Sequence, residues 1–266
     1  MHDMNSEMIA QLRGGQRMYG TMLRLIRSSA IAPIARHAGL DFIMLDMEHG
    51  AYDWQTVADV ALQAQAEGVA VMVRVPELSK HFVSGALDCG VQGVMVPMLE
   101  TIDEAEALAA WAKYPPAGRR GLGSSGGHTR YRKMTDVPAM VRSANEGTIA
   151  IAQIETQQAV ENATKIAQVP GIDAMVMGPN DLSMSLGHAG DVTTAEQDRA
   201  TRAVAAAAQR AGKIFGMHAG TETLRRWADC DMRLVLNAID DQILLNALRD
   251  LGQVTRELFQ AQTMAP

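Results

Sequence analysis

Two carboxylates in this sequence have the type and placement expected of ligands for a divalent cation. Glu155 ends one apolar run of the chain, and Asp181 follows the next such run, after Gly178-Pro179-Asn180. Hard oxygen ligands of this kind leave most coordination positions of the ion to water and substrate. A 2-oxo acid can fill two of those positions with its carboxylate and keto oxygens. The structural alternative is that Glu155 caps the following helix and that Asp181 pairs with a surface arginine.

A histidine and an arginine stand at the ends of two further apolar runs. His49 lies three residues after Asp46 and can act as a general base, with its tautomer fixed by Asp46 or a neighbouring carboxylate. Arg74 can bind a substrate carboxylate or stabilise the negative charge of a developing enolate. The structural alternatives are an ordinary loop histidine and a salt bridge from Arg74 to Glu77 or Glu48.

The lysines argue against imine chemistry. We place none of the five in the apolar body of the chain or at the C-terminal end of a predicted strand, and Lys213 begins a strand instead. A Schiff-base lysine needs a desolvated position in the site. Metal-assisted chemistry is then the remaining route to an enolate.

The elements that would position these side chains alternate along the whole chain. Short, mostly continuous apolar runs are typical of parallel strands covered on both faces. They lie at 19–24, 42–46, 70–75, 93–97, 148–154, 172–177, 213–217 and 232–236, with Ala-rich helical stretches at 54–67, 101–112, 157–168 and 195–211. Eight strand–helix units favour an α/β fold, a single (β/α)8 TIM barrel domain over residues 1–266, rather than an open doubly wound sheet.

Two intervals between predicted strands are longer than the others. One contains the Gly-rich segment 114–128, and the other contains residues 178–194. We expect both at the C-terminal rim of the barrel, where active sites are built. His128 in the first interval and His218 after the seventh strand are expected to be near substrate.

Composition excludes several classes of protein. The chain of 266 residues is 47% hydrophobic and 20% charged, with a net charge of −6, so we expect a large core and no nucleic-acid surface. No apolar run is long enough to span a membrane, and the N-terminus lacks the pattern of a signal peptide. Two cysteines cannot form a disulfide framework. We therefore expect a cytoplasmic protein without a membrane partner.

Five motifs in order resemble the HpcH/HpaI aldolase family, over roughly residues 18–250. They are Leu45-Asp46-Met47-Glu48-His49-Gly50, Val73-Arg74-Val75-Pro76, Tyr114-Pro115-Pro116-Ala117-Gly118-Arg119-Arg120-Gly121, Gln153-Ile154-Glu155-Thr156 and Gly178-Pro179-Asn180-Asp181-Leu182-Ser183. The resemblance implies a metal-dependent class II aldolase on a modified (β/α)8 barrel. Such an enzyme reversibly cleaves 4-hydroxy-2-oxo acids to pyruvate or hydroxypyruvate and an aldehyde.

The resemblance also implies a role for each motif residue. Glu155 and Asp181 would hold Mg²⁺, Mn²⁺ or Co²⁺. His49, oriented by Asp46, would perform acid–base chemistry through a metal-bound water, and Arg74 would stabilise the enolate oxygen. Pyruvate would contact Gln153 and the backbone around Pro179 and Asn180, and Asp88 matches an acidic position that reaches a neighbouring subunit's site. Relatives of this kind assemble as homohexamers, trimers of dimers, with the last helix exchanged between subunits.

Some features depart from the family pattern and leave the aldehyde open. The segment 123–131 is rich in Gly and Ser, and His218 and Asn237 are larger or more polar than the residues common there. Three alternative functions also remain on the same barrel. They are a citrate synthase-like or CoA-thioester lyase, an oxaloacetate decarboxylase and a non-catalytic binding protein. The intact set of Glu155, Asp181, His49 and Arg74 argues against the last of these.

Overall fold

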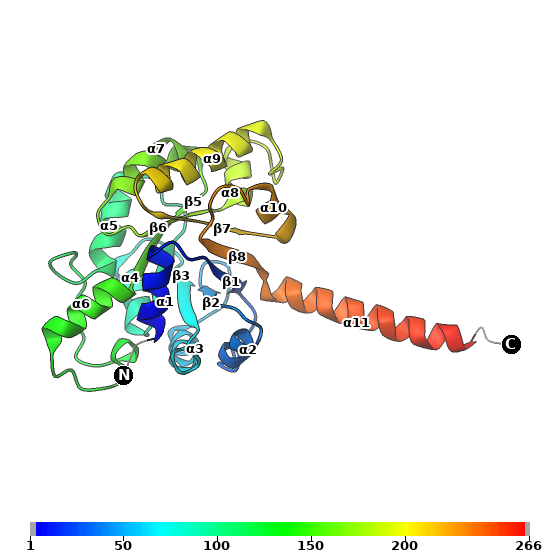
Figure 1. Ribbon diagram of the computed structural model, residues 1–266, viewed down its shortest axis with the longest axis horizontal. Coiled ribbons are helices and arrows are strands. Elements are labelled where there is room, and N and C mark those ends of the chain that lie inside the picture. Colours follow the sequence, from blue (N-terminus) through cyan, green and yellow to red (C-terminus); the bar gives the residue numbers. More distant parts are fainter. Residues whose placement is uncertain (1–3, 264–266) are drawn as a thin grey trace.

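Eight parallel strands close into a barrel in the order of the sequence, as the computed structural model of residues 4–263 shows (Figure 1). The strands are β1 (Met18–Leu23), β2 (Phe42–Asp46), β3 (Ala70–Arg74), β4 (Gly93–Val96), β5 (Ile149–Ile154), β6 (Ala174–Met177), β7 (Ile214–Ala219) and β8 (Leu234–Ile239). Each lies within about three residues of its predicted position. The predicted (β/α)8 fold is confirmed.

Helices follow the strands, and most of them surround the barrel. They are α1 (Met4–Arg13), α2 (Ile31–His37), α3 (Trp54–Glu67), α4 (Lys80–Asp88), α5 (Ile102–Ala112), α6 (Val137–Gly147), α7 (Gln157–Gln168), α8 (Pro179–Ser185), α9 (Ala195–Arg210), α10 (Thr221–Arg226) and α11 (Asp240–Thr263). The side chains of Asp53, Ser79 and Thr101 accept hydrogen bonds from the first turns of α3, α4 and α5. These caps fix where the three helices begin.

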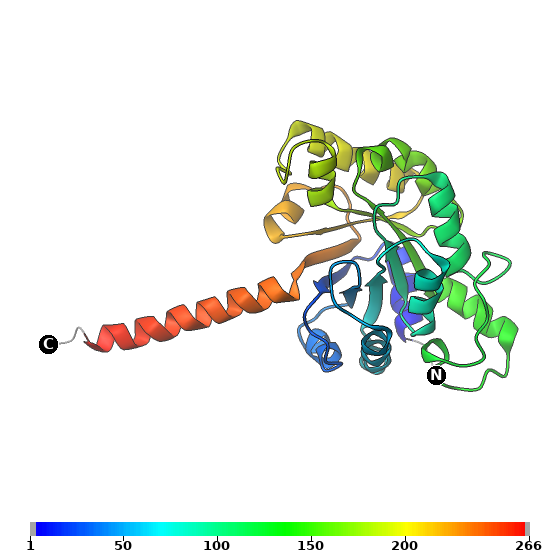
Figure 2. The same cartoon turned by 180° about the vertical axis from the view of Figure 1, so that it is seen from behind.

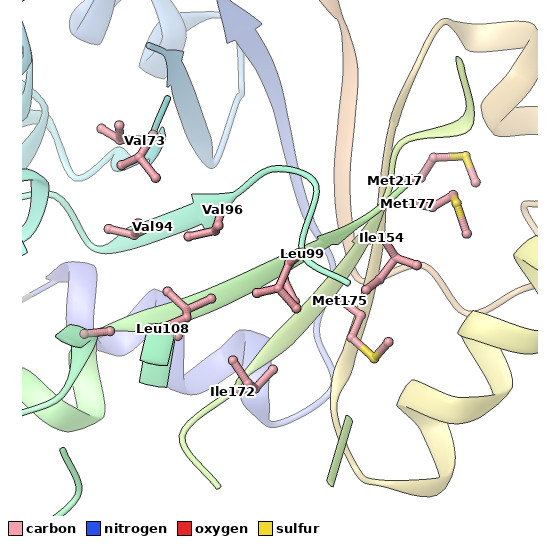
Figure 3. Close-up of a cluster of buried hydrophobic side chains, with 14 of the residues drawn as sticks. Val73, Val94, Val96, Leu99, Leu108, Ile154, Ile172, Met175, Met177 and Met217 are labelled. Atoms are coloured by element: carbon pink, nitrogen blue, oxygen red, sulfur yellow. The ribbon is translucent and has the colours of Figure 1, made fainter. Parts of the chain in front are cut away.

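Alternate side chains of each strand enter two different cores. The outer core lies between the strands and the helices, and Figure 3 shows part of it, including Val73, Ile154 and Met217. The inner core fills the barrel and includes Met44, Met72, Ile151, Val176 and Ile214. Because side chains alternate with a period of two, every second residue toward the end of a strand also faces inward.

The N-terminal end of the barrel is closed by α1. Its Ile9 and Leu12 are fully buried in the inner core, and Arg13 pairs with Asp173 at 2.9 Å. Lys113 is buried at this end as well, 2.9 Å from Asp173, and burial lowers its pKa. The expectation that no lysine lies in the apolar body was therefore wrong. Lys113 nevertheless stands at the opposite end of the barrel from the C-terminal ends of the strands.

The predicted position of the Gly-rich segment was also wrong. It follows α5 and precedes α6, so it lies at the N-terminal end of the barrel, not at the C-terminal rim. There Arg120 pairs with Asp88 at 2.6 Å, Arg130 donates to Gln65, and His128 lies beside the carbonyl of Asp88. The second long interval follows β6 and does lie at the C-terminal rim.

Helix α11 extends away from the barrel as a straight rod (Figures 1 and 2). Its main contacts are with β1 and β8, and the Asp240 carboxylate anchors its start by accepting from the backbone N–H groups of residues 24–26. Apolar side chains remain exposed along its length: Ile243, Leu244, Leu245, Leu248, Leu251, Val254, Leu258 and Phe259. None of the helices within residues 4–263 is long and apolar enough to cross a membrane.

Candidate active site at the mouth of the barrel

Polar side chains continue the inward-facing series where the strands end. Asp46 ends β2, Arg74 ends β3, Gln153 lies near the end of β5, and His218 lies near the end of β7. Glu155 follows β5 in the same phase as Gln153. The C-terminal ends of parallel strands meet on one side of a barrel, so these groups lie together at its C-terminal end, which we call the mouth.

Asp46 joins two arginines at this mouth. Its fully buried carboxylate accepts from Nε and a terminal nitrogen of Arg74 at 2.9 and 2.6 Å, and from Nε of Arg24 at 2.7 Å. Burial alone would raise the pKa of Asp46, but the hydrogen bonds and charges of Arg74 and Arg24 outweigh it and hold that pKa below its usual value. The pair is bidentate, so Asp46 fixes the plane of the Arg74 guanidinium.

Glu48, rather than Asp46, is the carboxylate nearest to the His49 ring. Its Oε2 lies 3.8 Å from His49 Nε2 and 2.9 Å from Arg74 Nη1. The carboxylate of Asp46 contacts His49 at its backbone N–H, at 3.4 Å, and not at its ring. The prediction that Asp46 orients the imidazole is therefore wrong, because both Asp46 oxygens bind guanidinium groups. The salt bridge from Arg74 to Glu48 is present, and the His49 ring is about half exposed, at 52%.

Glu155 is a buried carboxylate with an unusual pKa. It is 1% exposed and accepts from Met98 N at 2.7 Å and Gln153 Nε2 at 2.6 Å. Burial raises its pKa to about 7, and the negative charges of Asp181 and Glu48 act in the same direction. The positive charge of the surrounding residues is therefore too small to keep the Glu155 carboxylate ionised over its usual pH range.

Asp181 lies in the first turn of α8 and is exposed to the mouth. Its charge raises the pKa values of both Glu155 and Glu48. No arginine or lysine within residues 4–263 forms an ion pair with it, and α7 is capped by Thr156 rather than Glu155. Both structural alternatives for this pair are thus contradicted.

The surroundings of this pair fit a cation. A Cβ at Gly178 would collide with the Glu155 carboxylate and approach Gln153 Nε2 to 3.0 Å, so only glycine leaves this space. Gln153 Oε1 is buried and has no hydrogen-bond partner in the described part of the chain. Residues 4–263 contain no group of three or more His, Cys, Asp or Glu able to hold a metal. An ion at Glu155 and Asp181 would therefore take its remaining ligands from water and substrate.

The other predicted residues divide between the two ends of the barrel. Pro179 is buried at the start of α8, its carbonyl accepting from Gln197, and Asn180 is exposed beside it. Asp88 lies at the N-terminal end with Arg120, away from this chain's own mouth. Asn237 points outward and hydrogen-bonds with Thr221.

Sequence reasoning missed two contributors to the site. Arg24 follows β1 in the inward phase and could have been found from the alternation of Met18, Gly20 and Met22. Met98 contributes a backbone N–H from a left-handed conformation, with φ of 50°. Nothing in the side-chain pattern signals this conformation, which non-glycine residues rarely adopt outside constrained sites.

Comparison with known proteins finds relatives that match most of the chain. The family model for HpcH/HpaI aldolase/citrate lyase matches residues 24–243. A hydroxypyruvate/pyruvate aldolase from Delftia acidovorans is 36% identical over 92% of this chain and 90% of that protein. A 4-hydroxy-2-oxovalerate aldolase from Novosphingobium aromaticivorans is 35% identical over 95% of each.

A solved structure gives the same result. The crystal structure of an HpcH/HpaI aldolase/citrate lyase family protein from Burkholderia cenocepacia is 32% identical, has a TM-score of 0.85, and covers 94% of this chain and 99% of that one. The family model and these relatives each match most of the chain. The chain therefore belongs to the HpcH/HpaI aldolase/citrate lyase family.

Proposed function

We propose that this protein is a class II pyruvate aldolase. It reversibly cleaves a 4-hydroxy-2-oxo acid into pyruvate, or hydroxypyruvate, and an aldehyde. The observation that carries this function is that one mouth combines the buried Glu155, whose pKa is raised, the neighbouring negative charge of Asp181 and an arginine held by Asp46. Relatives named as aldolases of 2-oxo acids support the same reaction.

Glu155 and Asp181 are the residues that would hold the divalent ion, which we propose to be Mg²⁺, Mn²⁺ or Co²⁺. When bound, such an ion polarises the keto group of the substrate and so makes the enolate accessible. Gln153, Pro179 and Asn180 form the adjoining wall, against which the keto acid would lie. Arg74 stands across from them, already oriented by Asp46 and Glu48.

Each chain residue has a defined task in cleavage. His49 accepts the proton of the C4 hydroxyl, the C3–C4 bond breaks, and its electron pair forms the enolate while the aldehyde leaves. Arg74 donates a hydrogen bond to the oxygen on which negative charge develops. Because Asp46 and Glu48 hold this guanidinium before substrate binds, little reorganisation is needed during reaction. Protonation at C3 gives pyruvate, and the reverse sequence makes the bond.

Removal and return of metal tests this function. We expect EDTA to abolish cleavage of 4-hydroxy-2-oxo acids and added Mg²⁺, Mn²⁺ or Co²⁺ to restore it, measured as pyruvate released. Glu155→Ala should no longer bind Mn²⁺ in a direct binding assay, whereas the exposed Glu106→Gln on α5 should bind it normally. Full activity in metal-free protein, or failure to cleave any 4-hydroxy-2-oxo acid, would refute the proposal.

We also propose that the 266-residue chain works as one barrel domain in a cytoplasmic homohexamer, a trimer of dimers that exchanges α11. The exposed Leu244, Leu248 and Leu251 recur at helical spacing and form one apolar face with little to bury it in a single copy. In such an assembly Asp88 would reach a neighbouring subunit's mouth.

Light scattering tests the assembly. Leu248→Glu combined with Leu251→Glu should give a smaller particle, and Asn246→Glu, the same substitution at a polar position of α11, should not. An unchanged mass for the double variant would contradict exchange of this helix.

A further inference from the structure

His218 is an inward-facing side chain that the proposed chemistry does not use. On β7, Ile214 belongs to the inner core, and Phe215 and Met217 belong to the outer core. His218 has the same phase as Ile214 and therefore points into the mouth. Its ring is partly exposed, and its Nε2 lies 3.3 Å from the carbonyl oxygen of Ala238.

The hydrogen bond to Ala238 decides which ring nitrogen carries the proton. A carbonyl oxygen can only accept, so Nε2 must donate, and a neutral ring then has a lone pair on Nδ1. Within the described residues no group donates a hydrogen bond to Nδ1. Burial lowers the pKa of His218 to about 4, and the charges of Arg74 and Arg24 act in the same direction. The ring is thus neutral at physiological pH and presents an acceptor to the mouth.

The order of the strands places this acceptor next to the keto-acid end of the substrate, because β7 pairs with β6. The carboxylate pair and its wall come from β5 and the β6–α8 connection, and Arg74 comes from β3. We expect a substrate held there by its carboxylate and keto oxygens to extend its remaining carbons toward the part of the mouth formed by β7, β8 and β1. His218 is the residue of β7 that faces this space.

We propose that His218 is a specificity-determining residue that selects aldehydes bearing a hydroxyl group next to the carbonyl. A neutral nitrogen lone pair is complementary to a hydroxyl donor, gains nothing from a methyl group, and repels a carboxylate. This inference rests on the proposed aldolase function and deepens it by naming the class of acceptor. Asn237, a polar residue near the end of β8, faces outward to Thr221 and takes no part.

Paired aldehydes of equal carbon number provide the test. The kcat/KM for aldol addition of pyruvate is measured with glycolaldehyde against acetaldehyde, and with 2-hydroxypropanal against propanal. We expect the wild-type protein to prefer the hydroxylated member of each pair. His218→Leu should reduce that preference about five- to tenfold, the effect of losing one neutral hydrogen bond. Asn237→Ala should leave the ratio unchanged.

Two further variants separate recognition from support of the backbone. His218→Asn keeps an acceptor near the position of Nδ1, and His218→Gln keeps a donor near the position of Nε2, so we expect the asparagine variant to retain more of the preference. These two variants carry the test if the leucine variant does not fold. The inference would be overturned if the wild type used both members of each pair equally, or if His218→Gln retained more of the preference than His218→Asn. Absence of addition to every aldehyde would instead refute the aldolase function.

Discussion

Replacement of Glu155 by glutamine should change how the stability of the metal-free protein depends on pH. The native pKa of Glu155 is raised from 4.5 to about 7, whereas the unfolded chain has the ordinary value. Between these values the native state holds a proton that the unfolded state has released. Protonated Glu155 therefore favours the native state over the unfolded state, and this contribution to the free energy of unfolding is fully present below pH 4.5 and is lost as the pH rises through 7.

The size of this effect follows from the shift. One pKa unit corresponds to about 1.4 kcal/mol, so a rise from 4.5 to about 7 amounts to about 3 kcal/mol of unfolding free energy. Glutamine resembles the protonated acid and does not ionise. The stability of the wild type relative to Glu155→Gln should therefore fall by about this amount between pH 4.5 and pH 8.

Urea unfolding in EDTA, at a fixed protein concentration, measures the difference. Glu106→Gln, a change at an exposed carboxylate of α5, serves as the matched control and should follow the wild type at every pH. Addition of Mn²⁺ at pH 8 should stabilise the wild type by about 3 kcal/mol at one hundred times the dissociation constant and leave Glu155→Gln nearly unaffected. A wild-type-minus-variant difference that stays level across this range would refute the account of Glu155.

Three further predictions concern the mouth. His49→Ala should retain Mn²⁺ binding and lose turnover by about 10²–10⁴-fold, the usual contribution of a general base; near-normal turnover would contradict its role. Gly178→Ala should weaken Mn²⁺ binding, measured by calorimetry, because the new Cβ displaces the Glu155 carboxylate, and unchanged affinity would show that the carboxylate can move at no cost. Asp46→Asn should lower kcat more than it raises KM, because Arg74 keeps its charge but loses its bidentate partner; a pure KM effect would show that Arg74 acts only in binding.

The fold could be predicted almost completely from the sequence. Continuous apolar runs separated by amphipathic stretches specify parallel strands covered on both faces, and side-chain caps such as Asp53 and Thr101 mark where helices begin. The family prediction was confirmed over nearly the range that the motifs covered. These features are local or periodic, so one sequence is enough to reveal them.

The details of the site depend on partners that are distant in sequence. The spacing of three residues between Asp46 and His49 predicts that they pair, whereas the Asp46 carboxylate binds Arg24, just after β1, and Arg74, at the end of β3. The end of the barrel at which the Gly-rich segment lies cannot be predicted from interval length, because that length does not show whether an insertion precedes or follows the helix. The backbone N–H of Met98 has no signature in side-chain chemistry.

Side chains alternate between the two faces of each strand, so the positions of the polar groups at the mouth also depend on residues that pack on the outside of the barrel. Val73 and Arg74 are neighbours on β3, and Val73 packs in the outer core while Arg74 faces the mouth of the barrel. A slip of this strand by one residue would exchange the two environments and drive a guanidinium into hydrocarbon. The outer core between strands and helices therefore helps to fix the positions of the polar side chains at the mouth. Substitutions that leave a cavity in the outer core shown in Figure 3, such as Val94→Ala, are therefore expected to make the polar side chains at the mouth less firmly positioned, although none of those side chains is itself changed.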